Sequence, residues 1–183
     1  MRMQKLGLSA LALSCFLMSS CNMGNSNTNS IVYENTVDNY VPWMNEVTPN
    51  IMAIGNAHSG NYVYRLNASN QYTTLFNQTL KQISKSKIKK ITYSAFVIRE
   101  NNTVDCKLVI DVRDKTDKVL KWEGKDTKEV KDLKDKEWTK ITMELDLTKD
   151  NLNDPDNHVR IYTLNAAKAD VLVDDISIAF EVE

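Results

Sequence analysis

The sequence predicts an all-β domain that folds as a two-sheet antiparallel β-sandwich. Runs in which apolar and polar residues alternate recur along residues 31–183, and this period of two is typical of half-buried strands. Short segments rich in turn residues separate the runs, as in "NASNQ" at residue 67 and "KDNLNDPDN" at residue 149. Many short strands joined by turns favour two packed sheets, and a jelly roll is a common form of this architecture.

The clearest runs lie in three segments. "KKITYSAFVIRE" begins at residue 89, "DCKLVIDVRD" at 105 and "WTKITMELDL" at 138. In the first, Tyr93, Ala95 and Val97 share one face of the strand, while Phe96 and Ile98 share the other. The shorter runs "NYVYRL", "HVRIYTLN" and "VLVDDISIAF" predict further strands from residues 61, 158 and 171.

No convincing amphipathic helix is visible in the sequence. The nearest candidate is "KDTKEVKDLKDKEW" at residues 125–138, in which Val130 and Leu133 stand three apart. A helix of about a dozen residues is marginal by itself. We therefore expect a charged loop or a short strand that covers a sheet edge.

The first twenty residues have the composition of a secretory signal. "MRMQK" is short and basic, and the apolar stretch that follows carries no charge and is short for a membrane span. "LMSSC" resembles the lipobox of bacterial lipoproteins, which implies that Cys21 becomes a lipid-carrying N-terminus. We expect a signal peptide at 1–20, a polar tether at 21–30 and the sandwich at 31–183. The alternatives are an ordinary signal with an incidental cysteine, or acylation at Cys15, which fits the lipobox less well.

The predicted protein is therefore exported and held by a lipid at the bacterial cell envelope, at the outer membrane or the cell surface. The net charge of −1 argues against a nucleic-acid binder, which usually carries a strongly basic surface. Once Cys15 leaves with the signal and Cys21 is acylated, only Cys106 remains. No intrachain disulfide is then possible, and we expect Cys106 to be a small buried apolar residue.

Two adjacent carboxylates, Asp174 and Asp175, interrupt the last predicted strand. Strands disfavour Asp, and an unpaired buried charge is costly. If Val173 and Ile176 both face the core, the alternation changes phase at this pair, and a β-bulge would supply the change. If instead Leu172 faces the core, Asp174 points inward and requires a cation. Both interpretations are open from the sequence.

Four motifs resemble carbohydrate-binding modules with a galactose-binding-like jelly roll, which accompany many bacterial glycoside hydrolases. They are "YEN" at residues 33–35, "AHSGNYVYRL" at 57–66, "LKDKEWTKITMELDL" at 133–147 and "VRIYTLNAAKADVLVDDISIAF" at 159–180. They occur in the order of that family and span residues 31–183. The resemblance implies the jelly-roll fold, but the same fold serves many functions.

The resemblance also implies a structural Ca²⁺ ion that ties the first and last strands together. The matching positions are Glu34 with one or both of Asp174 and Asp175, and backbone carbonyls near residues 59–61 would complete the shell. Calcium takes six to eight oxygen ligands, so carboxylates and loop carbonyls are suitable. The alternative is that the two Asp side chains are solvated or paired with a lysine.

A sugar site needs an aromatic ring that stacks on the C–H face of a pyranose. The candidate rings are Trp43, Tyr72, Phe96, Trp122 and Tyr162. Trp122 is the first choice because charged residues surround it, and Trp138 is the weakest because it matches a packing position of the family. The alternative for each ring is a place in the core.

Polar side chains near such a ring would bind hydroxyl groups. The candidates on the outward parity of the predicted strands are Lys107, Asp111 and Arg113, or Arg160. The alternative is that they form a solvated sheet face. No nucleophile motif, phosphate loop or metal-ligand cluster appears, and nothing singles out a catalytic carboxylate pair.

We therefore predict a lipid-anchored protein without catalytic activity that binds carbohydrate. The alternative is a structural or adhesive envelope lipoprotein that uses the sandwich to contact another protein.

Overall fold

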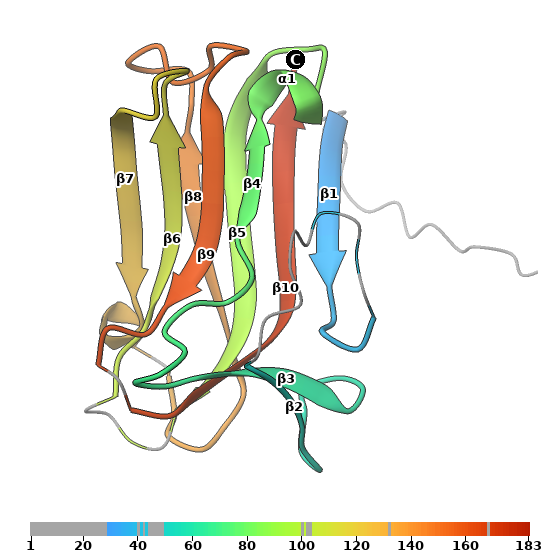
Figure 1. Cartoon of the computed structure of the whole chain (residues 1–183), viewed down its shortest axis with the longest axis vertical. Helices are drawn as coiled ribbons and strands as arrows, with labels where there is room; N and C mark the ends of the chain where they lie inside the picture. Colours follow the sequence, from blue (N-terminus) through green and yellow to red (C-terminus); the bar gives the residue numbers. More distant parts are fainter. Residues whose placement is uncertain are drawn as a thin grey trace, which may run out of the picture.

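The computed structural model describes residues 29–39, 41, 43, 50–99, 101, 104–131, 133–167 and 169–183. Two antiparallel sheets pack face to face, as Figure 1 shows. The first sheet has the order β2-β3-β10-β5-β8, with β1 also paired to β10, and the second has the order β4-β9-β6-β7. The predicted two-sheet antiparallel β-sandwich is confirmed.

The first sheet consists of β1 (Asn29–Asn35), β2 (Ile51–Ala53), β3 (Tyr62–Leu66), β5 (Ile88–Arg99), β8 (Thr139–Asp146) and β10 (Val171–Val182). The second consists of β4 (Phe76–Thr79), β6 (Lys107–Arg113), β7 (Val119–Asp126) and β9 (His158–Leu164). The two short helices are α1 (Leu80–Ile83) and η1 (Thr127–Glu129). None of the helices in the described part of the chain is long and apolar enough to cross a membrane.

Three strands were not predicted from the sequence. β2 and β4 have only three and four residues, too few to display an alternation. β7 keeps its first four residues exposed, so it carries little apolar signal. The described residues of the segment at 125–138 form the end of β7, the short helix η1 and loop. The expected loop is present, the short helix was not predicted, and the covering of a sheet edge stays a prediction.

The core lies between the sheets and contains the inward side chains of both. Tyr93 of β5 and Thr163 of β9 join the two sheets across it, with 2.7 Å between their hydroxyl oxygens. Burial raises the pKa of Tyr93 far above its ordinary value. Cys106 is 1% exposed, as expected of a small apolar residue, and burial raises the pKa of its thiol to about 12.

A β-bulge divides β10 into two parts. Asp174 pairs with Phe96 of β5 and Ser177 pairs with Ser94, so β10 has one more residue than β5 in this interval. Asp175 adopts a φ of 44°, the left-handed conformation often found in such bulges. Val173 and Ile176 are both in the core. The alternation therefore changes phase at the Asp pair, as the first interpretation requires.

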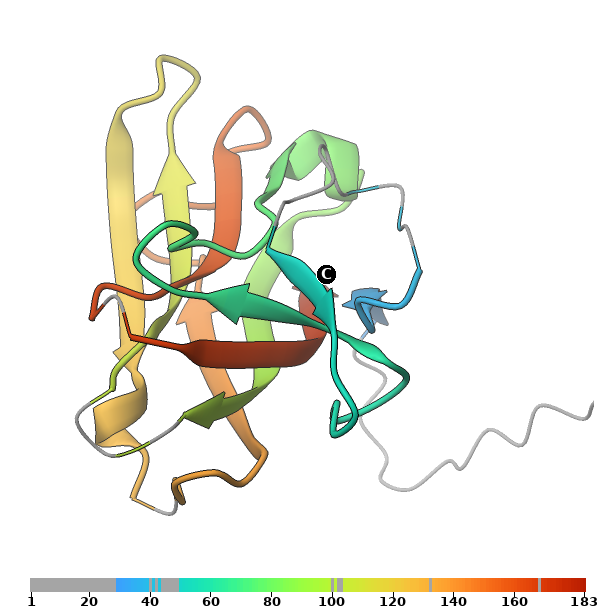
Figure 2. The same cartoon turned by 60° about the horizontal axis from the view of Figure 1, so that its bottom comes forward.

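The bulge marks the place where β10 changes its neighbour. Before it, residues 171–173 pair with β3, and after it residues 176–182 pair with β1. β5 pairs with β10 on the opposite edge on both sides of the bulge. Figure 2 shows β3 alongside the start of β10, with β2 on the outer side of β3. β1 lies apart from β2 and β3.

The second interpretation is wrong, because Val173 and not Leu172 faces the core. Asp174 shares the outer face of the sheet with its pair Phe96, and the loop before β3 covers it with backbone N–H groups. Its side chain is fully buried. Oδ2 accepts hydrogen bonds from the N–H groups of His58 (2.9 Å) and Ser59 (3.1 Å), and Oδ1 accepts one from Asp175 (2.8 Å). Burial raises the pKa of Asp174, and these N–H donors oppose the increase.

We predict that Asp174→Asn lowers the free energy of unfolding by about 2 kcal/mol, because the amide NH₂ faces N–H donors that lose their acceptor. Urea denaturation measures the change. The control is Asp170→Asn, which removes an exposed ion pair with Arg65 and costs less than about 1 kcal/mol. Equal losses in the two variants would show that the Asp174 hydrogen bonds do not hold the bulge.

Candidate functional site

A row of four side chains crosses the outer face of the second sheet. Asn77 of β4 pairs with Arg160 of β9, Arg160 with Asp111 of β6, and Asp111 with Trp122 of β7. Neighbouring strands lie about 4.8 Å apart, so the row spans about 14 Å. We call Asn77, Arg160 and Asp111 the polar row, and Trp122 of β7 stands next to it.

All three members of the polar row contain a buried atom with no hydrogen-bond partner among the described residues. These atoms are Asn77 Oδ1, Arg160 Nε and Asp111 Oδ1, which form the sequence acceptor, donor, acceptor along the row. Asp111 is only 1% exposed. Since buried polar atoms are normally hydrogen-bonded, three such atoms in one row are unusual for a sheet face.

The other polar atoms of the row are held by ion pairs. Arg113 Nε donates to Asp111 Oδ2 at 2.7 Å, and Arg160 Nη2 donates to Asp117 Oδ1 at 2.7 Å. These contacts fix both side chains and balance two guanidinium groups against two carboxylates. The unpaired atoms therefore belong to side chains that are already oriented.

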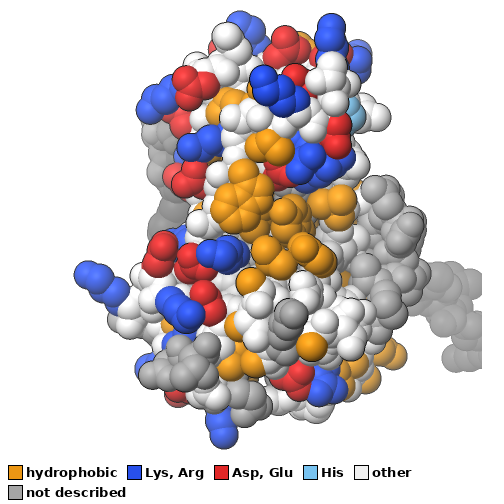
Figure 3. All heavy atoms as spheres, turned by 60° about the vertical axis from the view of Figure 1, so that its left-hand side comes forward, with side chains coloured by type: hydrophobic (Ala, Val, Ile, Leu, Met, Phe, Trp, Pro, Cys, Tyr) orange, Lys and Arg blue, Asp and Glu red, His pale blue; other side chains and the backbone are white. Residues whose placement is uncertain are grey.

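Three aromatic rings lie beside the polar row. The ring centroids of Tyr72 and Tyr162 are 5.7 Å apart, and Trp122 Nε1 donates to the Tyr162 hydroxyl at 3.4 Å. Tyr72 is 53% exposed and Trp122 is 44% exposed. We call Tyr72, Tyr162 and Trp122 the aromatic platform. On the side of the molecule that carries β6 and β7, Figure 3 shows hydrophobic side chains with charged side chains around them.

A hollow of about 220 Å³ joins the platform to the row, and its lining includes Tyr72, Tyr162, Asp111, Arg113 and Arg160. The structure thus brings together four of the predicted ligand-binding residues, namely Trp122, Tyr162, Asp111 and Arg113. Tyr72 and Arg160, also considered in the sequence, join them. Lys107 lies at one end of β6, where it pairs with Asp126.

Two predicted ligand-binding residues lie elsewhere. Trp43 is 8% exposed and packs in the core, 5.8 Å from the ring of Phe76, so it has no free face for a sugar and that prediction is wrong. Phe96 is on the outer face of the first sheet, where it stacks on His58 with 3.4 Å between ring centroids. Alternation alone does not distinguish an outward ring that is free from one that a loop covers.

Trp138 behaves as a packing residue. Its Nε1 donates to the carbonyl of Asn56 at 2.8 Å, in the loop that precedes β3.

The sequence missed Asn77, because four residues of β4 give no strand signal. It also missed Gly124, although a glycine two residues after a tryptophan in one strand lies on the same face of the sheet.

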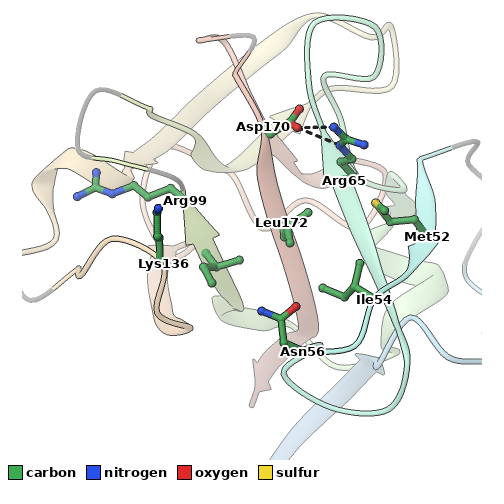
Figure 4. A pocket seen from close by; sticks show the side chains of 9 residues that line it. Met52, Ile54, Asn56, Arg65, Arg99, Lys136, Asp170 and Leu172 are labelled. Carbon is green, nitrogen blue, oxygen red and sulfur yellow. Dashed lines mark hydrogen bonds and ion pairs between the residues drawn. The ribbon is translucent and has the colours of Figure 1, made fainter.

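A second hollow, of about 390 Å³, opens on the outer face of the first sheet (Figure 4). Ile98 is among its lining residues, Leu172 lies in its middle, and Arg65 and Asp170 form an ion pair at its edge. None of the described residues that line it is aromatic. Arg99 extends away and donates to the carbonyls of Val104 and Leu133. The aliphatic floor of this second hollow therefore suits a sugar less well than the aromatic platform does.

Of the residues expected to bind calcium, Asp174 and Asp175 have other partners. Glu34 and Asp175 line one groove of about 250 Å³ on the first sheet. Asp175 accepts from Ser59 Oγ at 2.6 Å and contacts His58 Nδ1 at 2.5 Å. Asp174 faces three N–H donors, whose positive ends would repel a cation. No group of three or more His, Cys, Asp or Glu in the described part of the chain could hold a metal. The carboxylates of Asp174 and Asp175 therefore do not fit the calcium shell that we expected.

The fold is similar to that of a known carbohydrate-binding module. The C-terminal family 22 carbohydrate-binding module of Clostridium thermocellum Xyn10B superposes with a TM-score of 0.51 at 11% identity, over 82% of this chain and 92% of that one. At this identity the similarity shows a shared fold alone.

Two further solved structures are similar at a lower score. They are the CBM22-1 xylan-binding domain of Paenibacillus barcinonensis Xyn10C (TM-score 0.49, 13% identity, 86% of this chain and 99% of that one) and the xylan-binding module CBM15 (0.49, 14%, 85% and 99%). No protein-family model matches the sequence, and no curated protein matches it.

We predict that excess EDTA leaves the melting temperature unchanged, because Asp174 already has N–H partners. An ion that binds only the folded state, present at a concentration 100 times its Kd, would add about 2.7 kcal/mol to the free energy of unfolding. Thermal melts in EDTA and in excess CaCl₂ make the comparison. A melting temperature several degrees higher in CaCl₂ would restore the calcium interpretation.

Proposed function

We propose that this protein binds carbohydrate without catalysis, across the outer face of its second sheet. The observation that carries the proposal is the exposed aromatic platform beside a hollow of about 220 Å³ that Arg113 and Arg160 also line. A pyranose presents an apolar C–H face and a rim of hydroxyl groups. The platform and the two arginine side chains offer a matching surface to each.

The chemistry of a hydroxyl group suits this hollow. A sugar hydroxyl in the hollow can accept hydrogen bonds from the partly exposed guanidinium groups of Arg113 and Arg160. Hydrogen bonds to charged groups are stronger than those between neutral groups. The C–H face of the same sugar then stacks on Trp122 or Tyr72, whose rings are exposed.

The absence of catalysis belongs to the same proposal. Asp111 is committed to Arg113, and Asp117 to Arg160, so neither carboxylate of this face is free to act as an acid or base. The family 22 module with the shared fold is described as a carbohydrate-binding module, which is consistent with a binding role here.

Lipid anchorage and export to the bacterial cell envelope are also proposed. They rest on the signal-like segment and on Cys21, which lies outside the described residues. β1 begins at Asn29, inside the segment expected to be a tether. Asn29 is eight positions after Cys21, so a tether would reach at most about 28 Å.

A contact with another protein is the second candidate function. Val119 and Leu120 are 44% and 40% exposed on β7, next to the platform. Exposed apolar side chains that lie together can mark a protein interface. A glycan screen separates the candidates, since a protein-contact surface would retain no polysaccharide.

We predict that Trp122→Ala and Tyr72→Ala each weaken binding to a retained polysaccharide by about tenfold, the equivalent of about 1.4 kcal/mol. Affinity electrophoresis against a panel of soluble polysaccharides first identifies a ligand and then measures the variants. Tyr62→Ala is the matched control, because Tyr62 is 43% exposed on β3 of the other sheet. A well-folded protein that no polysaccharide retains would contradict the proposal.

We predict that cells expressing the full chain incorporate a labelled fatty acid into it, and that Cys21→Ser abolishes the label. Cys15→Ser is the control, since it lies in the part of the signal that is removed. Labelling that survives Cys21→Ser but is lost in Cys15→Ser would move the lipid to the other cysteine.

A further inference from the structure

Gly124 lies directly beneath the indole ring of Trp122. The two residues are two apart on β7, so they share the outer face. A Cβ placed on Gly124 would be 2.7 Å from Trp122 Cη2 and 3.0 Å from Cζ3. Real Cβ atoms do not approach other heavy atoms this closely. The six-membered part of the indole therefore occupies the space that a side chain at position 124 would fill.

The indole is held at its other edge by Tyr162. Its Nε1 donates to the Tyr162 hydroxyl at 3.4 Å, so its one N–H is engaged and its ring face remains for stacking. Gly124 pairs with Val109, and Val109 pairs with Tyr162. Val109 alternates with core residues and so points outward, yet it is fully buried. The rings of Trp122 and Tyr162 flank it on both sides and account for this burial.

We propose that Gly124 is a positioning residue for the ligand platform: it lets the Trp122 ring lie low across β7, beside the polar row. This inference rests on the proposed function. With any larger residue at 124 the indole would have to turn away from the sheet. It would then lose the Tyr162 contact, and its face would no longer lie next to Asp111.

The strand itself gives no reason for a glycine at this position. The φ of Gly124 is outside the left-handed region, so an alanine suits the backbone. Glycine weakens a strand interior, because it has no side chain to pack and loses more entropy on folding. A close approach by another group is the remaining reason, and the approaching group here is Trp122.

A double-mutant cycle tests the proposal. We expect Gly124→Ala to weaken binding of the retained polysaccharide by about tenfold when Trp122 is present, and by less than about twofold in the Trp122→Ala background. Gly55→Ala is the matched control, because nothing lies within 4 Å of a Cβ at that position, and it should not change binding. Equal losses in both backgrounds would overturn the proposal.

A spectroscopic readout separates this inference from the proposed function. The indole N–H resonance of Trp122, assigned with Trp122→Phe, should shift in Gly124→Ala and stay unchanged in Gly55→Ala. This measurement needs no ligand. If the wild-type protein binds no polysaccharide but the resonance shifts, the proposed function fails while Gly124 still positions Trp122. An unchanged resonance together with wild-type affinity would refute the role of Gly124.

Tyr162→Phe provides a second variant in case Gly124→Ala does not fold. It removes the hydroxyl that accepts from Trp122 Nε1 but keeps the ring that covers Val109. We expect the Trp122 resonance to move and binding to weaken, with little loss of stability. No movement of the resonance in this variant would show that the indole orientation does not depend on its supports.

Discussion

The first sheet depends on the hydrogen bonds that the buried carboxylate of Asp174 accepts. This carboxylate has no exposed surface, and it collects the N–H groups of His58 and Ser59 together with that of Asp175. His58 and Ser59 belong to a loop more than a hundred residues earlier in the chain. The bulge that follows lets β10 pair first with β3 and then with β1, while β5 stays on its other edge. Asp174 is thus both an acceptor for the loop and the start of a change in pairing.

The same loop makes the two outer faces of the sandwich different. On the first sheet, His58 stacks on Phe96 and the Asn56 carbonyl accepts from Trp138, so two outward aromatic rings are engaged by the protein itself. On the second sheet, Tyr72 and Trp122 keep large exposed surfaces. The loop that Asp174 and Asp175 hold therefore covers aromatic rings on one face and leaves the other face with the platform.

The polar row and Trp122 depend on the register of four strands. Asn77, Arg160, Asp111 and Trp122 are separated in sequence but stand opposite one another because β4, β9, β6 and β7 pair in one register. A slip of one residue in any strand would turn its member of the row into the core. Inward packing of both sheets therefore sets the outward arrangement of the candidate site, even though the core residues themselves contact no ligand.

The sequence by itself determined most of the long strands, β7 excepted, and which of their side chains face the core, because alternation is a local property of each strand. It also showed that Asp174 needed an explanation, and the bulge alternative is the correct one, since Val173 and Ile176 both face the core. Only the tertiary structure decided the donors to Asp174, the burial of Trp43 and the pairing of Trp122 with Gly124 and Tyr162. Contacts between strands far apart in the chain follow from register and packing, which alternation within one strand does not encode.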